Sequence, residues 1–432
     1  MLRRVIPCAL AALALLGVAV VPWLGSDLPR AEARPESDPE PSSPENKLLA
    51  AEAALFFSLR PADFTGDDLL KAAFLDVDKE IERELRVSLS DVERVTFALV
   101  RGGFIKLVHV HKAYDRDKLK EAYVGGVDKF ADKGFKDGAP PKMEVKEKKV
   151  GGRTIYYGGE WRRWTRGFCP IDKTTFAAGE VLALENFFKA KGKASAEAVE
   201  AVNLAGKHSL VIGLDGKRLM AAARYDREES DKAMREEMER FKDKSKDFEE
   251  KKKEEEQINF RAQKDKDKEE KAKEEKPDPD VDELFGPMRG PEVIMLLPYR
   301  PLLRAKYCLV TVDVKKDYTL KAKVTANGKE DVDETETAMK MALYVLRDMA
   351  VMLPKQERSG LGHLRPLTPH LKKAFEAAKV ERKGNVLSAT VSMTPEDGLA
   401  KKVRDAVAEE KKKSEEREKK WREERFKDKE KK

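Results

Sequence analysis

Residues 95–111 decide the fold class of this chain: Val95-Thr-Phe-Ala-Leu-Val-Arg-Gly-Gly-Phe-Ile-Lys-Leu-Val-His-Val-His111. Two apolar runs, 95–100 and 104–111, flank the pair Gly102-Gly103. Apolar runs of strand length that are separated by a glycine turn are typical of a β-hairpin. The stretch therefore predicts two antiparallel strands joined by a tight turn.

The same pattern recurs along the chain. Further hairpins are predicted from runs 142–149 and 153–158, 161–169 and 174–178, 308–314 and 320–326, and within 380–393, with single strands at 54–59 and 209–214. Helical periodicity is present at 67–85, 115–123, 181–190, 196–204, 339–353 and 370–378. No regular strand-helix-strand alternation occurs, so the sequence predicts an α+β fold with antiparallel sheet and packed helices. It also suggests two similar halves, 48–224 and 286–398, as a hypothesis.

Charged residues are concentrated in two segments. They make up 39% of the 432 residues, against about 25% in ordinary globular domains, and the excess lies in 225–276 and 399–432. Met234, Met238, Phe241 and Phe248 follow a heptad-like step, but the register then reaches Lys252, so a coiled coil is not sustained. We expect 225–285 to be a charged helical or low-complexity insertion and 399–432 to be a charged C-terminal helix or tail.

The N-terminus carries the features of an export signal. Arg3 and Arg4 precede an uncharged apolar run at 5–25, and Ala31-Glu-Ala33 supplies the small residues that a signal peptidase recognises. We expect residues 1–33 to be a signal peptide and the Pro-rich residues 34–47 to be a disordered linker. Because the apolar run approaches the roughly 20 residues that span a bilayer, an uncleaved membrane anchor is the alternative. Either way the protein is expected in the periplasm or outside the cell.

Charge and cysteine content narrow the function classes. The chain has 87 basic and 80 acidic residues, and such a balance disfavours a nucleic-acid surface, which needs a concentrated positive field. After removal of the signal, Cys169 and Cys308 remain. An oxidising compartment permits a disulfide between them, and two separate buried thiols are the alternative.

Histidines provide the sharpest local indication of a metal site. His109 and His111 alternate with Val110, which places both imidazoles on one face of a strand, and His208 at the head of another strand could be a third ligand. No third ligand lies nearby in the sequence, and Lys106, Lys112 and Arg116 disfavour a dication. We therefore expect a structural or exposed histidine pair, with His109, His111 and His208 as weak metal candidates.

Two other motifs have ordinary structural explanations. Asp278, Asp280 and Asp282 have the spacing that begins a calcium loop, but Glu283 and Arg289 stand where such a loop needs glycine and glutamate. A linker explains this segment better. Residues 161–166, Trp-Arg-Arg-Trp-Thr-Arg, could place one aromatic and basic face against sugars or an anionic surface. Inward packing of a tryptophan with solvated arginines is the expected explanation.

Six short stretches carry a resemblance to known sequences. They are Ala54-Leu-Phe-Phe-Ser-Leu-Arg-Pro, Asp91-Val-Glu-Arg-Val-Thr, Lys112-Ala-Tyr-Asp-Arg-Asp-Lys-Leu, Lys149-Val-Gly-Gly-Arg-Thr-Ile-Tyr-Tyr, Thr174-Thr-Phe-Ala-Ala-Gly-Glu and Lys207-His-Ser-Leu-Val-Ile-Gly-Leu. They resemble a group of uncharacterised exported proteins that planctomycete bacteria encode in many copies. The resemblance covers 54–214 well and 298–393 more loosely, and the charged insertion departs from it. It implies an envelope protein of unknown function and supplies no catalytic residue.

These observations favour an exported, non-enzymatic binding or structural module of the cell envelope. No catalytic and no cofactor-binding residue is predicted, and no cofactor. The alternatives are a metal-dependent hydrolase that uses His109 and His111, and a helical spacer whose charged arms engage a partner. An unidentified envelope partner and peripheral association with a membrane or cell wall are compatible with this interpretation. The oligomeric state stays open.

Overall fold

The structure of the chain is a computed structural model. It describes residues 43–73, 81–82, 84–124, 144–158, 165–222, scattered positions from 224 to 238, 300–352, 354 and 362–430. The predicted signal peptide, most of the linker, most of the charged insertion, Asp278–Asp282 and Trp161–Trp164 lie outside these residues.

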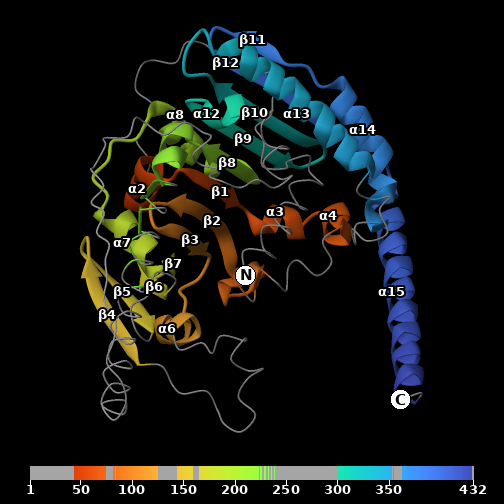
Figure 1. The fold of residues 1–432 in the computed structure, drawn as a ribbon, viewed down its shortest axis with the longest axis horizontal. Coiled ribbons are helices and arrows are strands. Elements are labelled where there is room, and N and C mark those ends of the chain that lie inside the picture. Colours follow the sequence, from red (N-terminus) through yellow and green to blue (C-terminus); the bar gives the residue numbers. More distant parts are fainter. Residues whose placement is uncertain are drawn as a thin grey trace, which may run out of the picture.

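The twelve described strands form one antiparallel sheet (Figure 1). Its order is β11-β12-β10-β9-β8-β1-β2-β3-β7-β6-β5-β4. The strands are β1 (Leu55–Leu59), β2 (Val92–Val100), β3 (Gly103–Val110), β4 (Val145–Val150), β5 (Arg153–Gly158), β6 (Arg166–Pro170), β7 (Thr175–Glu180), β8 (Leu210–Leu214), β9 (Tyr307–Val314), β10 (Tyr318–Thr325), β11 (Glu381–Lys383) and β12 (Val386–Met393). The α+β fold with antiparallel strands is confirmed, and residues 48–224 and 286–398 contribute eight and four strands to the same sheet.

The helices flank this sheet. They are α2 (Pro44–Glu52), α3 (Pro61–Thr65), α4 (Asp68–Ala73), α6 (Arg116–Val124), α7 (Val181–Lys189), α8 (Ala196–Ala205), α12 (Arg300–Arg304), α13 (Val332–Met352), α14 (Thr368–Ala377) and α15 (Leu399–Glu430). Two 3₁₀ helices, η1 (Leu89–Asp91) and η5 (Gly362–Leu367), are also described, and residues 216–222 are helical as well. Helix α2 takes in residues 44–47, which the sequence assigned to the linker, because Ser43 caps it and Pro44 supplies its first turn.

The glycine pair that predicted the central hairpin makes its turn. Val100 pairs with Gly103, so Arg101 and Gly102 form the two-residue connection between β2 and β3. Gly102 has a φ of 85° and Gly103 has a φ of 128°. Residues other than glycine rarely adopt such values. A Cβ at Gly103 would also lie 1.8 Å from the Glu180 carboxylate. A Cβ at Gly102 would lie 2.8 Å from Leu182 of α7, so backbone conformation and close neighbours both favour glycine at these two positions.

Alternate residues of the central strands pack in separate cores on the two faces of the sheet, as β9 shows. Tyr307 and Leu309 of β9 pack in the cluster that contains α2, α7 and α8, whereas Val310 and Val312 pack in the cluster that contains α4, α12, α13 and α14. A third cluster, with Leu119 of α6, lies on the same face as the latter, beyond β1. We call the face under α2, α7 and α8 the first face, and the opposite one the second face.

Both edges of the sheet carry charged side chains. Edge strand β4 has the sequence VKEKKV, and β11 consists of Glu381, Arg382 and Lys383. Charged edge strands resist pairing with other chains. Strand β4 is also held to α7, since Lys148 Nζ lies 2.7 Å from Glu185 Oε1, and Glu185 is buried.

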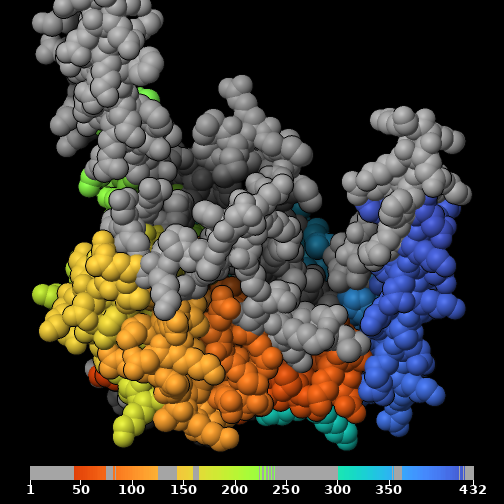
Figure 2. All heavy atoms as spheres, turned by 90° about the horizontal axis from the view of Figure 1, so that it is seen from below, coloured from red at the N-terminus to blue at the C-terminus, as the bar shows by residue number. Residues whose placement is uncertain are grey.

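The C-terminal helix leaves the body soon after it begins. Leu399 is 1% exposed and Val403 is fully buried, and α15 contacts α4 and η5. In Figure 2 the blue α15 forms one flank of the molecule beside the orange residues of the N-terminal part. Side chains 411–417 are all exposed. As predicted, the first turns of this helix pack on the body, and beyond residue 410 every side chain that the structure describes is exposed.

No helix within the described ranges combines the length and apolar character needed to cross a membrane.

The packing of α15 predicts that its two ends differ in their effect on stability. Leu399→Ala removes a buried side chain and should lower the free energy of unfolding by about 2–5 kcal/mol. Ending the chain after Arg417 removes a part whose described side chains, 419–421 and 423, are exposed, and it should change the free energy of unfolding by less than about 0.5 kcal/mol. Urea unfolding followed by circular dichroism measures both. Lys401→Ala, at an exposed position of α15, is the control, and a large loss on truncation would show that the distal helix packs on the body.

Candidate functional site

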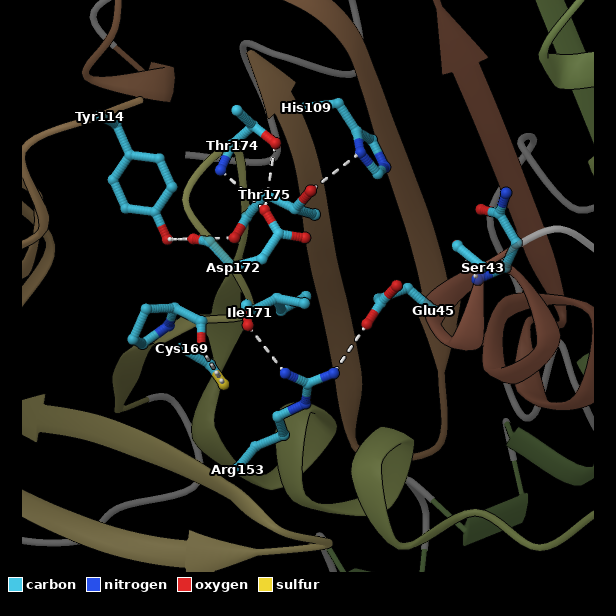
Figure 3. A network of polar contacts seen from close by, with 12 residues as sticks. Ser43, Glu45, His109, Tyr114, Arg153, Cys169, Ile171, Asp172, Thr174 and Thr175 are labelled. Atoms are coloured by element: carbon cyan, nitrogen blue, oxygen red, sulfur yellow. Dashed lines mark hydrogen bonds and ion pairs between the residues drawn. The ribbon is translucent and has the colours of Figure 1, made fainter. Parts of the chain in front are cut away.

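A network of polar contacts at the predicted histidine strand joins four elements (Figure 3). It lies where the N-terminal turn of α2, the end of β3, the start of β5 and the β6–β7 turn meet. The antiparallel pairing of β3 with β7 places His109 opposite Thr175. Chain segments that are far apart in sequence therefore share one site.

Arg153 is the centre of this network. Its Nη2 lies 2.9 Å from Glu45 Oε1, and its Nη1 donates to the carbonyl of Ile171 at 2.8 Å. The Glu45 side chain is 7% exposed and that of Arg153 is 32% exposed. A buried carboxylate needs a paired charge, and Arg153 supplies it while tying α2 to the β6–β7 turn (Figure 3).

The β6–β7 turn is closed by its own polar groups. Asp172 Oδ1 accepts from the Thr174 amide at 2.7 Å and from its hydroxyl at 3.1 Å. Burial raises the pKa of Asp172, but the hydrogen bonds from Thr174 and Thr175 outweigh it and the pKa is lowered. The Tyr114 hydroxyl lies 2.9 Å from the Asp172 carbonyl and 3.0 Å from that of Thr175. Hydrogen bonds within the turn and from Tyr114 outside it therefore hold the turn in place.

His109 is bound into the same network. Its Nδ1 lies 3.2 Å from the Thr175 hydroxyl. Burial lowers the pKa of His109 below its ordinary value, and Arg94 acts in the same direction, although Glu93, Glu45 and Asp172 oppose them. The imidazole is therefore neutral at neutral pH.

Both described cysteines are free and buried. Cys169 lies in the core of the first face and Cys308 in that of the second, so the disulfide considered from the sequence does not form. Burial raises the pKa of Cys169 to about 12 and also raises that of Cys308. Neither thiol ionises near neutral pH, and neither is a nucleophile there.

The three histidine candidates are not brought together. His111 follows the end of β3 and is exposed. His208 precedes β8, which β1 and β2 separate from β3 in the sheet. In the part of the chain that the structure describes, no three His, Cys, Asp or Glu side chains are grouped so that they could hold a metal ion. These positions offer no ligand set for zinc.

His208 instead forms a pair with Asp313. Its Nδ1 lies 2.9 Å from Asp313 Oδ2. Burial raises the pKa of Asp313, but His208, Lys315 and Lys321 outweigh it and the pKa is lowered. This geometry orients an imidazole as in catalytic triads. The hydroxyl of the adjacent Ser209 donates its hydrogen bond to Asp63 Oδ2 at 2.7 Å. It therefore does not donate to the His208 imidazole, as the serine of a triad would.

Sequence reasoning missed Glu45, Arg153 and Asp313. Glu45 pairs with a residue 108 positions away, and His208 with one 105 positions away. No local pattern marks such partners. The only usable indication was Ser43-Pro44, a helix start within the segment that was assigned to the linker.

No protein-family model and no curated protein matches the chain. Three crystal forms of a protein named TP0453 are structurally similar. Forms I, III and IV give TM-scores of 0.34, 0.35 and 0.32 at 7%, 7% and 8% identity. The alignments cover 85%, 85% and 83% of this chain and 98%, 99% and 95% of the other. Similarity at this level identifies no shared activity.

The Arg153 contacts predict a structural role for the network. Arg153→Met leaves the buried Glu45 carboxylate unpaired and should cost about 2–3 kcal/mol of unfolding free energy, less than for a fully buried pair because Arg153 is partly exposed. Adding Glu45→Leu should recover part of the loss. Chemical denaturation of the two single variants and the double variant measures the coupling. Lys149→Met, on the exposed side of β4, is the control, and equal effects at positions 149 and 153 would contradict the role.

The lowered pKa of His109 predicts a pH effect on stability. The unfolded chain binds a proton at His109 as the pH falls through about 6.5, whereas the folded state resists it. Stability is therefore complete above that pH and falls with acidification between the unfolded and folded pKa values. The free energy of unfolding of the wild type should drop more between pH 7 and 5 than that of His109→Gln. Parallel pH dependences of the two proteins would be inconsistent with a buried neutral imidazole.

Proposed function

We propose that this chain is an exported protein of the bacterial envelope that acts by binding or structural association rather than by catalysis. The observation that carries the export is the N-terminal sequence, with Arg3-Arg4, the uncharged run 5–25 and Ala31-Glu-Ala33. The resemblance to exported proteins of planctomycete bacteria supports the same location. We include this chain among them as part of the proposal.

The contacts that the side chains of the candidate site make with other protein groups support a non-catalytic role. Arg153, Asp172, Tyr114 and His109 each contact another protein group. The buried Cys169 thiol is protonated. A catalytic group must be able to reach a substrate, and these side chains instead fasten four elements to one another.

A second role is favoured by α15. This helix is 32 residues long, and its exposed segment 411–417 carries Lys, Glu and Arg without a buried apolar face. A helix that is polar all round suits a solvated connection between bodies better than a core position. An arm that engages an envelope partner is therefore the second candidate function.

Export is tested by fractionating the producing cells and determining the N-terminal residue by mass spectrometry. We expect the protein in the envelope or medium with Arg34 as its first residue. A variant with Ala31→Arg and Ala33→Arg should retain its signal peptide uncleaved. Ala11→Arg, in the apolar run, should block export. Full-length protein in the cytoplasm would refute export. An intact Met1 in the membrane fraction would refute cleavage and leave the anchored form.

A further inference from the structure

Helix α13 carries a second apolar surface that faces away from the sheet. Met341, Tyr344, Val345 and Met352 are 41%, 59%, 41% and 58% exposed. The first three positions are three and four residues apart, and Met352 is seven after Val345, so the side chains lie on one side of the helix. We call these four residues the α13 stripe.

The opposite side of α13 already has its partner. Met339, Ala342, Leu343, Leu346 and Ala350 are buried in the core of the second face. A helix at the surface of a globular protein normally has one apolar side and one polar side. Exposed apolar side chains that lie together on one side of a helix are a feature of contact surfaces.

Charged residues flank the stripe in a symmetric arrangement. Lys340 lies four residues before Tyr344 and Asp348 lies four residues after it, about 6 Å along the helix in either direction. Arg347 lies over the Tyr344 ring, with its guanidinium carbon 5.3 Å from the ring centroid, and binds Asp348 at 2.8 Å. Lys340 binds Glu336 at 2.5 Å. Tyr344 therefore lies midway between one basic and one acidic side chain, each of which has a partner on its own helix.

We propose that the α13 stripe binds the same stripe of a second copy of this chain, with the two helices antiparallel and crossing at Tyr344. This arrangement places Lys340 of each copy level with Asp348 of the other. It covers the apolar residues, and it allows Lys340 and Asp348, which pair with Glu336 and Arg347 on their own helix, to form two ion pairs between the copies. A parallel arrangement would instead bring like charges level with each other, which is unfavourable.

A lipid surface fits the same residues less well. The Asp348 carboxylate lies within the stripe, and the first turn of α13 carries Asp333 and Glu334. Carboxylates would face the negative charge of anionic lipids and would lose hydration in a bilayer. A protein partner with complementary cations has neither cost.

The size of the contact sets the expected affinity. Specific interfaces bury about 800 Å² on each partner, and a single helix on each copy supplies a contact near the lower end of the specific range. We therefore expect reversible dimers with a dissociation constant in the micromolar range.

The test is sedimentation velocity of the protein purified from its producing cells, over about 1 to 100 µM. The wild type should shift from monomer to dimer across this range. Lys340→Glu and Asp348→Lys should each weaken dimerisation at least tenfold, because each opposes like charges. The double variant Lys340→Glu with Asp348→Lys should restore it to within about threefold, since the pairs are reformed with reversed sign.

Controls separate this interface from other causes of association. Lys401→Glu, a charge reversal on α15, should leave the dimer unchanged, and Tyr344→Ser should weaken it. Thermal melting by circular dichroism confirms that each variant is folded. If Lys340→Glu does not fold, Asp348→Lys and Tyr344→Ser still decide the matter.

Three outcomes would overturn the proposal. The wild type could remain monomeric at every concentration, or it could form dimers that neither charge reversal nor Tyr344→Ser weakens. A monomer that binds vesicles of anionic phospholipid through Tyr344 would assign the stripe to lipid instead.

Discussion

The backbone pairing of β8 with β9 joins the two parts of this chain, and the remaining architecture depends on it. Strand β8 returns beside β1 and pairs with it from Leu55 and Leu214 to Leu59 and Leu210. Its other edge pairs with β9, from Leu210 and Val312 to Leu214 and Cys308. Without β9, the buried edge of β8 would expose unpaired backbone groups, which is costly and promotes association. The continuous sheet then provides two faces on which separate helix layers form.

Side chains reinforce this junction from both faces. His208 pairs with Asp313, and the Ser209 hydroxyl accepts from the Val314 amide while it donates to Asp63. Lys306 binds Glu197 and Lys323 binds Glu200, which tie α8 to β9 and β10. These contacts connect residues more than 100 positions apart, so the polar network around Arg153 and the α13 stripe belong to one folded unit.

Local patterns in the sequence predicted the elements whose partners are close in the chain. Gly102-Gly103 and Gly151-Gly152 identified their hairpins, since a two-residue turn fixes the pairing of adjacent strands. The periodicity of α13 predicted its buried side. It did not predict the apolar stripe on the opposite side, because the pattern of an amphipathic helix has only one apolar side. The β1–β8 and β8–β9 pairings, and the partners Glu45 and Arg153, could not be predicted. They depend on how distant segments meet, and no short-range regularity encodes this.

If β8 and β9 make one cooperative unit, native-state hydrogen exchange with increasing denaturant tests it most directly. Amides of β1, β8, β9 and β10 should open with one common free energy that equals the global free energy of unfolding. Amides of β9 and β10 that open together at a clearly lower free energy, while β1 and β2 stay protected, would show that the two parts fold separately and would contradict the account.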